Sequence, residues 1–263
     1  MLTLDLSGKV ALITGVGSGI GKSVAVVLAR AGCSVSGCDL SKTGSEAALG
    51  FSGAVEAEGS ESLYSLCDVS DTTELESFVQ KTVDRFGKID IVVSNAGMNI
   101  FKGAQNCMVE DWDFNMDLNL RAHWLLAKHC KPYLEETRGV IIIMTSNHAY
   151  YTIPGCFPYN VTKTALKGLV RSLAIEWGPA IRTVGIAPGF IETSANEKWF
   201  GNFPEPEKER QRTINMHPVK KLGTPEEVGA LCAFLASDMA AFISGTTYLM
   251  DGGRSALMQD HCT

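Results

Sequence analysis

Val10-Ala11-Leu12-Ile13-Thr14-Gly15-Val16-Gly17-Ser18-Gly19-Ile20-Gly21 is an apolar run that passes directly into a cluster of glycines. A segment of helical period follows, so the glycines lie between a predicted strand and a predicted helix. Glycines at such a turn let the backbone approach a pyrophosphate, which the N–H groups and the positive dipole end of the helix stabilise. The stretch therefore predicts a nucleotide site, with phosphate contacts at Gly15, Ser18, Gly19 and Ile20.

The same alternation of short apolar runs with longer helical segments continues along the whole chain. It is typical of βαβ units that build a parallel sheet covered by helices. The predicted strands are residues 10–14, 34–39, 62–66, 89–94, 140–146, 183–187 and 246–250. The predicted helices are residues 19–31, 72–86, 110–133, 159–177 and 225–237, with a further candidate at 46–58 that is interrupted by two glycines. No linker or repeat divides residues 1–263, so we expect a single α/β domain with a seven-stranded parallel sheet.

Composition excludes several classes of protein. The chain has 263 residues, a formal net charge of −6 and 45% apolar residues, which is globular and acidic. Nucleic acid and anionic membrane surfaces are poor partners for an acidic protein. The apolar runs are too short to span a bilayer, and Met1-Leu2-Thr3-Leu4-Asp5-Leu6 has no signal-peptide pattern, so we expect a soluble cytoplasmic protein.

The eight cysteines are scattered and form no CxxC pair. In a chain with no signal peptide this spacing favours reduced, buried thiols over a disulfide framework. No metal site is expected.

Acidic residues at the ends of the second and third strands indicate which nucleotide binds. Asp39 closes the second strand, where a carboxylate can accept hydrogen bonds from both adenosine ribose hydroxyls and would repel a 2′-phosphate. The nearby Lys42 is interpreted as a surface residue, so NAD is favoured over NADP. Asp68 and Val69 follow the third strand and are predicted to contact the adenine edge, although Asp68 could instead cap the next helix.

Tyr159 and Lys163 are four residues apart and therefore lie on one face of a predicted helix. That helix follows the strand that ends at Thr145-Ser146, so a hydroxyl, a phenol and an ammonium group are expected at one rim of the sheet. A free tyrosine titrates near pH 10, too high for a base at neutral pH, and a nearby positive charge would stabilise its phenolate.

With Ser94-Asn95-Ala96-Gly97, Asn119, Pro188-Gly189 and Asp251-Gly252-Gly253 in the same order, the chain resembles the classical short-chain dehydrogenase/reductase family over nearly its whole length. The resemblance implies a doubly wound (Rossmann) fold and a homotetramer. It also implies that Tyr159 is the acid/base, that Lys163 lowers the pKa of Tyr159 and binds the nicotinamide ribose, that Ser146 orients the substrate oxygen, and that Asn119 supports a proton relay. Further cofactor contacts are implied for Asn95, Ala96, Gly97, Pro188, Gly189, Ile191 and Thr193.

Three positions depart from the family's pattern. Ser94 stands where asparagine is usual, Thr145 where serine is frequent, and Val184 where asparagine is common. Ser94 and Thr145 keep a hydrogen-bonding group, whereas Val184 does not, so the departures bear on local packing and not on the catalytic set.

Residues after the catalytic strands should line the substrate pocket. The substrate candidates are Asn99, Asn147, His148, Tyr151 and Trp199, with Met98 and Tyr150 beside them. Many of these side chains form hydrogen bonds, so a polyhydroxylated or anionic substrate fits better than a steroid or a long acyl chain. Residues 192–222 are charged, contain three aromatic rings and lack a strand pattern, which predicts an irregular, mobile lid.

The sequence therefore predicts an NAD-dependent oxidoreductase that acts on a secondary alcohol, or the hemiacetal carbon, of a sugar or other polar cyclic alcohol. One alternative is a ketone or 3-oxoacyl reductase that uses NAD(P)H. Another is a nucleotide-sensing scaffold without catalysis, which retention of Asn119, Ser146, Tyr159 and Lys163 disfavours.

Overall fold

Seven parallel strands form one sheet in the computed structural model, which describes residues 4–257. The strand order is β3-β2-β1-β4-β5-β6-β7. The strands are β1 Val10–Thr14, β2 Ser34–Asp39, β3 Ser62–Leu66, β4 Ile91–Ser94, β5 Val140–Met144, β6 Arg182–Pro188 and β7 Thr247–Met250. The predicted seven-stranded, doubly wound single domain is confirmed. Cys262 and residues 1–3 lie outside the described part of the chain.

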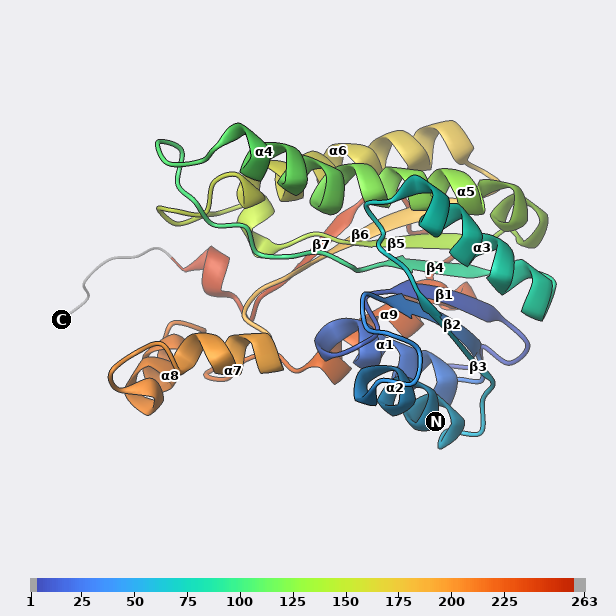
Figure 1. Cartoon of the computed structure of the whole chain (residues 1–263), viewed down its shortest axis with the longest axis horizontal. Coiled ribbons are helices and arrows are strands. Elements are labelled where there is room, and N and C mark those ends of the chain that lie inside the picture. The colour runs from blue at the N-terminus through green and yellow to red at the C-terminus, as the bar shows by residue number, and fades with distance from the viewer. Residues whose placement is uncertain (1–3, 258–263) are drawn as a thin grey trace.

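Helices cover both faces of the sheet (Figure 1). On one face lie α1 Gly19–Arg30, α2 Glu46–Glu56 and α9 Pro225–Ala236. On the other lie α3 Thr72–Phe86, α4 Val109–Met116, α5 Ala122–Thr137 and α6 Tyr159–Trp177. Each layer buries its own apolar cluster against the sheet, around Phe51 and Leu28 on the first face and around Phe78 and Leu126 on the second. Strands β2 and β3 are added on one side of β1, and β4 to β7 follow on the other side. This change of direction in the strand order opens a ligand crevice at the carboxyl ends of β1 and β4.

One predicted helix is not continuous in the structure. Residues 110–133 were expected as a single helix, but a π-helical turn, Asp117–Arg121, separates α4 from α5. Asn119 lies within this turn and its side chain bonds to Met98 and Asn115. An extra residue in a helical turn is frequent at functional sites, because it redirects the side chains around it.

The candidate segment at 46–58, which contains two glycines, forms helix α2. The Ser45 hydroxyl accepts a hydrogen bond from the Ala48 N–H and so caps α2. Gly53 lies in open space, so its missing side chain leaves no gap in the core. Phe51 and Val55 are fully buried and supply the packing that stabilises this helix.

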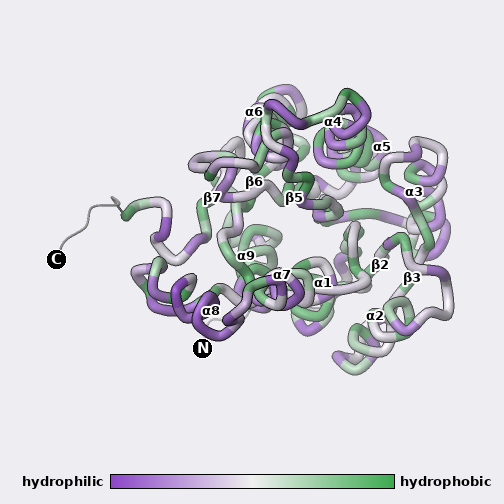
Figure 2. Tube along the Cα trace, turned by 60° about the vertical axis from the view of Figure 1, so that its left-hand side comes forward, coloured by the Kyte–Doolittle hydropathy of each residue, from purple (hydrophilic) through white to green (hydrophobic). Residues whose placement is uncertain are grey.

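Residues 192–222 contain regular structure that the sequence reading missed. Helix α7 spans Ser194–Phe200 and α8 spans Pro206–Asn215. Thr193 accepts a hydrogen bond from the Asn196 N–H and caps α7, and Pro206 occupies the first turn of α8. Figure 2 shows that α8 is hydrophilic along much of its length, whereas the neighbouring α9 is hydrophobic. Such a polar helix gives little periodic signal in a sequence.

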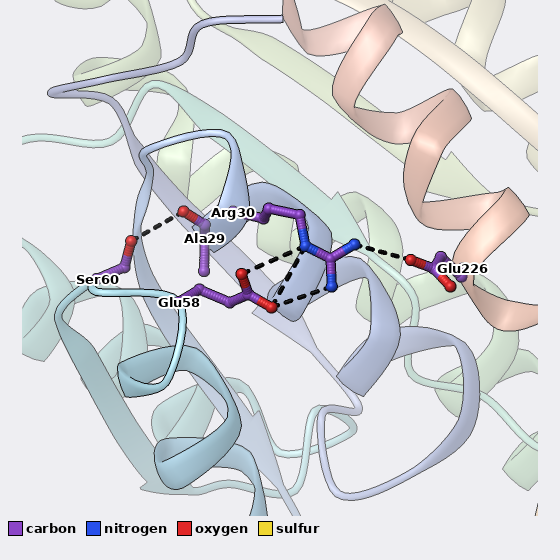
Figure 3. A network of polar contacts seen from close by, with 5 residues as sticks. All are labelled: Ala29, Arg30, Glu58, Ser60 and Glu226. Carbon is purple, nitrogen blue, oxygen red and sulfur yellow. Dashed lines mark hydrogen bonds and ion pairs between the residues drawn. The ribbon is translucent and has the colours of Figure 1, made fainter.

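The Arg30 side chain joins three segments that are distant in sequence (Figure 3). Its guanidinium pairs with Glu58 beyond α2 at 3.0 Å and with Glu226 at the start of α9 at 2.8 Å. Nearby, the Ser60 hydroxyl donates to the carbonyl of Ala29 at 2.9 Å. These groups are exposed to solvent, so they align the ends of the helices and contribute little stability.

Helix α9, which packs on α1, begins with a reciprocal pair of hydrogen bonds between Thr224 and Glu227. A substitution at Thr224 measures how much this pair contributes to stability. The Thr224 hydroxyl accepts from the Glu227 N–H at 3.2 Å, and the Glu227 carboxylate accepts from the Thr224 N–H at 2.9 Å. Thr224→Ala is expected to lower the free energy of unfolding by about 1 kcal/mol, because one cap is lost. Thr224→Ser keeps the hydroxyl and serves as the control in a urea titration. Equal stability of the alanine variant and the wild type would contradict this.

Candidate active site

The glycine turn after β1 is shaped by close backbone contacts. A Cβ on Gly21 would overlap the carbonyl oxygen of Gly15, so only glycine fits there. Gly15 and Gly19 have φ angles of 75° and 57°, a region that favours glycine. Ser18 directly precedes α1 and Ile20 lies in its first turn. The N-terminus of α1 therefore lies at the carboxyl edge of the sheet, as an anion site requires.

Asn95 and Ala96 brace this turn from β4. The Thr14 hydroxyl accepts hydrogen bonds from the N–H groups of both residues, each at 3.0 Å. The Asn95 side-chain amide donates to the carbonyl of Thr14 at 2.9 Å, so its interactions are with the protein itself. The sequence analysis did not include Thr14 among the site residues. A polar side chain at the end of a buried strand is the feature that could have identified it.

Asp39 lies against the glycine turn. Its carboxylate accepts from the Gly17 N–H at 3.0 Å, and its other oxygen accepts from the Ser41 N–H and hydroxyl at 3.2 and 3.0 Å. The negative charge is thus held where an adenosine ribose would approach.

Asp68 and Val69 follow β3 beside this position, and Val69 is buried. Asp68 accepts hydrogen bonds from Ser70 and does not cap α3. Asp71 is the cap, with bonds from the N–H groups of Thr73 and Glu74. The alternative that Asp68 is a helix cap is therefore wrong.

Tyr159, Lys163 and Ser146 meet at the carboxyl end of β5. Lys163 is only 3% exposed, and its ammonium donates to the carbonyl of Met144 at 3.1 Å and lies 5.6 Å from the centre of the Tyr159 ring. The Ser146 hydroxyl accepts from the His148 N–H at 3.2 Å and is hydrogen-bonded to the Tyr159 phenol. A hydroxyl, a phenol and an ammonium group are thus gathered at one rim of the sheet, and these groups are suited to general acid–base chemistry.

Burial governs the protonation of this group. Loss of solvent raises the pKa of Tyr159 to about 12, against the opposing effect of its hydrogen bond to Ser146. Burial also lowers the pKa of Lys163 to about 8, so the ammonium form persists at neutral pH. Desolvation is the largest cause of the pKa shift of both groups, and the expectation that Lys163 lowers the pKa of Tyr159 stays a prediction.

Asn119 is fully buried behind Lys163. Its side-chain oxygen accepts from the Met98 N–H at 3.1 Å, and its amide donates to the Met98 carbonyl at 2.9 Å and to Asn115 at 3.0 Å. A Cβ on Gly97 would lie 2.6 Å from the Asn119 oxygen and 3.5 Å from the Lys163 nitrogen, so these three residues are neighbours. Asn115 was missed by the sequence reading; it is a buried polar residue four positions before Asn119.

The segment after β6 closes the other side of the crevice. Gly189 lies against Asp251, and a Cβ there would lie 2.6 Å from the Asp251 Cβ. The Ile191 carbonyl accepts from the Asn196 amide at 2.7 Å, so the N–H of Ile191 is the main-chain group left for a ligand. Thr193 lies beside Gly19 of the glycine turn. Pro188, Gly189, Ile191 and Thr193 therefore border the same crevice as α1.

The predicted substrate residues divide into two groups. His148 lies at the site, with its ring 6.1 Å from that of Tyr159, and the Asn147 oxygen accepts from the Ser146 hydroxyl at 3.3 Å. Asn99 is exposed, and Tyr151 is 61% exposed. Trp199 packs on Phe200 and Phe203 of the 192–222 segment and on Phe190, which follows β6.

Phe101 is an aromatic wall that the sequence reading missed. Its ring lies edge-on to Tyr159 at 5.4 Å and to His148 at 5.9 Å. The neighbouring Tyr150 hydroxyl donates to the carbonyl of Thr247 and is not free for a substrate. The wall of the site is therefore more apolar than the sequence alone indicated.

Within residues 4–257, every helix is too short or too polar to cross a bilayer. The same residues contain no cluster of three or more His, Cys, Asp or Glu side chains suited to a metal ion, and their seven cysteines are free.

The chain is similar to proteins of one family along nearly its full length. A family model described as enoyl-(acyl carrier protein) reductase matches residues 15–255. The 3-oxoacyl-[acyl-carrier-protein] reductase FabG of Thermotoga maritima is 34% identical over 254 residues, covering 95% of this chain and 99% of the relative. A crystal structure of levodione reductase superposes with a TM-score of 0.89 at 33% identity, covering 96% of this chain and 99% of that one. A 7α-hydroxysteroid dehydrogenase in complex with NADH and 7-oxo glycochenodeoxycholic acid gives a TM-score of 0.88 at 32% identity, covering 95% and 96%.

The protonation state of Tyr159 can be measured directly. Since burial raises its pKa to about 12, wild type and Tyr159→Phe should show the same phenolate absorbance up to about pH 10, where a free tyrosine is half ionised. Ser146→Ala should raise the pKa further, because the hydrogen bond that opposes the shift is removed. A Tyr159-dependent ionisation near or below pH 10 in the protein alone would contradict the dominance of burial.

Proposed function

Because the chain belongs to the short-chain dehydrogenase/reductase family of NAD(P)-dependent oxidoreductases, we propose that it is an NAD-dependent enzyme that interconverts a secondary alcohol and a ketone. The observation that supports this most directly is the meeting of Ser146, Tyr159 and Lys163 beside the glycine turn. These residues place proton transfer next to the cofactor crevice.

Each of the three side chains has a distinct role in this proposal. The Ser146 hydroxyl orients the substrate oxygen, and Tyr159 accepts its proton during oxidation and returns one during reduction. The Lys163 ammonium, anchored on the Met144 carbonyl, is placed to bind the nicotinamide ribose and to stabilise the phenolate. A nicotinamide cofactor held by the glycine turn, Asp39 and Lys163 would supply hydride transfer, and the positive charge of its oxidised ring would favour the phenolate of Tyr159.

A preference for NAD is supported by Asp39. Its carboxylate is fixed by Gly17 and Ser41 at the edge of the crevice, where it would accept hydrogen bonds from ribose hydroxyls and repel a 2′-phosphate.

Reduction of a 3-oxoacyl group is a second candidate, favoured by the similarity to FabG. The same three side chains catalyse either direction, so the two candidates differ in substrate. A scaffold without catalysis is opposed by the complete acid–base set.

The proposed substrate is an alcohol or ketone on a ring. The Phe101 ring beside Tyr159 favours a flat or cyclic substrate, and 7-oxo glycochenodeoxycholic acid in the similar steroid dehydrogenase is a ketone that also carries an acid group. Sugar specificity stays a prediction, since Tyr150 is engaged by Thr247 and Asn147 by Ser146.

The proposal includes a homotetramer in the cytoplasm. Helices α5 and α6 present Trp124 and Ile175, which are 43% and 80% exposed. Light scattering after size exclusion measures the assembly, and a monomer would contradict it.

The function is tested by incubating the protein with ketones and secondary alcohols, both cyclic and linear, and with sugars and 3-oxoacyl thioesters. NADH absorbance reports turnover in both directions. Oxidation of NADH by at least one ketone supports the proposal. Binding of NADH without turnover of any of these compounds would favour the alternative of a scaffold without catalysis.

Tyr159→Phe removes the transferable proton and keeps the ring. We expect kcat to fall by about 100-fold or more, the scale of general acid–base catalysis, while the Kd of NADH stays within about twofold. Tyr133→Phe, a change to a tyrosine near the C-terminal end of α5 that contacts Gln80, is the control. Retention of most activity in Tyr159→Phe would mean that another group moves the proton.

Asp39→Ser removes the charge that faces the ribose. The wild type is expected to prefer NAD over NADP by about tenfold or more in kcat/KM. Asp39→Ser is expected to reduce this preference, because the variant no longer repels the 2′-phosphate of NADP. Asp68→Ser is the matched control at the end of the next strand. Equal use of both cofactors by the wild type would overturn the assignment to NAD.

A further inference from the structure

His123 is a buried titratable side chain that the proposed mechanism does not use. It lies in the first turn of α5, four residues after Asn119, and is 1% exposed. Helix α5 packs on β4 (Figure 1). A buried polar ring is costly unless it forms a hydrogen bond, so its partner indicates what the ring holds in place.

The partner of His123 is Ser94, the last residue of β4. The His123 Nδ1 and the Ser94 Oγ are 2.6 Å apart, and Ser94 is 3% exposed. Residue 94 is one of the positions that depart from the family's pattern, in which asparagine is usual. Serine is shorter, and here its polar contact comes from an imidazole on α5.

Burial keeps His123 uncharged at neutral pH. It lowers the pKa of the imidazole well below its ordinary value, and the charge of Lys163 acts in the same direction. The hydrogen bond with Ser94 therefore joins two neutral groups. Such a bond fixes a position through its distance and angle and adds no charge beside the crevice.

The segment that begins at Ser94 borders the cofactor crevice. The N–H groups of Asn95 and Ala96 both donate to the hydroxyl of Thr14 at the start of the glycine turn. A Cβ on Gly15 would lie 2.9 Å from the Asn95 amide nitrogen and 3.1 Å from the Ala96 Cα. The segment and the glycine turn are thus in close contact, and a shift of one changes the shape of the crevice.

Asn119 holds the other end of this segment. It lies one helical turn before His123, and its side chain bonds to the N–H and the carbonyl of Met98 at 3.1 and 2.9 Å. Residues 94–98 are therefore tied at the first residue by His123 and at the last by Asn119. Both ties come from the same stretch of helix.

A second observation relates His123 to the walls of the crevice. Its ring lines a narrow internal space together with Thr14, Val69 and Ala96. Val69 is predicted to contact the adenine edge, and Thr14 braces the glycine turn. An effect of His123 on the cofactor therefore passes through these neighbours.

We propose that His123 is a positioning residue for the cofactor. Its hydrogen bond fixes the Ser94 end of the 94–98 segment, as Asn119 fixes the Met98 end, and so keeps the segment and the glycine turn in the shape that binds the nicotinamide cofactor. The inference rests on the proposed function only in the identity of that cofactor.

The order of the segment is tested in the protein alone by hydrogen–deuterium exchange of peptides that contain residues 95–98. His123→Leu has a similar volume and removes the hydrogen bond, so it should speed exchange there by about fivefold or more, the scale of one neutral hydrogen bond. His123→Asn can place an amide nitrogen or oxygen near the position of Nδ1 and should keep most of the protection.

The effect on the cofactor is measured by NADH fluorescence. His123→Leu should raise the Kd of NADH by about fivefold or more, whereas His123→Asn should stay within about twofold of the wild type. Ser94→Ala removes the other half of the contact. The double variant of Ser94→Ala and His123→Leu should bind NADH about as either single variant does, because both changes remove the same bond.

Cys130→Ala is the matched control for stability. It truncates another fully buried side chain of α5 and should lower the melting temperature while leaving both exchange at 95–98 and the Kd of NADH unchanged. Ser94→Ala, which should raise the Kd as His123→Leu does, carries the test if the leucine variant does not fold.

Two results would overturn the inference. One is an unchanged Kd of NADH in the variants that lack the bond, whether or not exchange becomes faster, because the bond would then serve the fold alone. The other is an equal rise in Kd in Cys130→Ala at an equal loss of melting temperature. Failure of the proposed function is a different result, in which the wild type binds NADH but turns over no alcohol or ketone, since neither exchange nor affinity requires turnover.

Discussion

The close passage of the backbone between Gly15 and Gly21 is the constraint on which the rest of the crevice depends. No Cβ fits at Gly21, so α1 starts immediately after β1 and its N-terminus points along the carboxyl edge of the sheet. The Thr14 hydroxyl then binds the main chain of Asn95 and Ala96, which ties β4 to the same turn. Because the strand order changes direction between these two strands, the crevice opens beside this glycine turn, where the backbone can approach a pyrophosphate.

Desolvation determines the chemistry of the residues beside that crevice. Tyr159 is held as a neutral phenol with a pKa of about 12, and Lys163 keeps its proton up to about pH 8. In this environment the phenol is a poor base until positive charge increases around it. In the proposed function, the positive ring of a bound, oxidised cofactor would supply such a charge. The buried amides of Asn115 and Asn119 bond to each other and to the main chain of Pro158 and Met98, which joins the segments around this group.

The substrate side is assembled from the ends of strands that are far apart in sequence. His148 follows β5, and Ile191 and Thr193 follow β6. Parallel strands bring these loops to one edge, and α7 and α8 border them. The loops lie outside the core of the sheet, and the same fold occurs in relatives named as a levodione reductase and a 3-oxoacyl-[acyl-carrier-protein] reductase.

The sequence by itself determined the sheet, the glycine turn, the position of Asp39 and the common helix face of Tyr159 and Lys163, because these depend on local periodicity and on neighbours within a few residues. Only the tertiary structure decided the π-helical turn at Asn119, the Phe101 ring against Tyr159 and the helices within 192–222. The first two involve contacts between segments that are distant along the chain, whereas α7 starts at a local cap and α8 at Pro206, but α8 is too polar to give a periodic signal. Burial is the physical reason: it raises the pKa of Tyr159 and lowers that of Lys163, and it exists only after the strands have assembled.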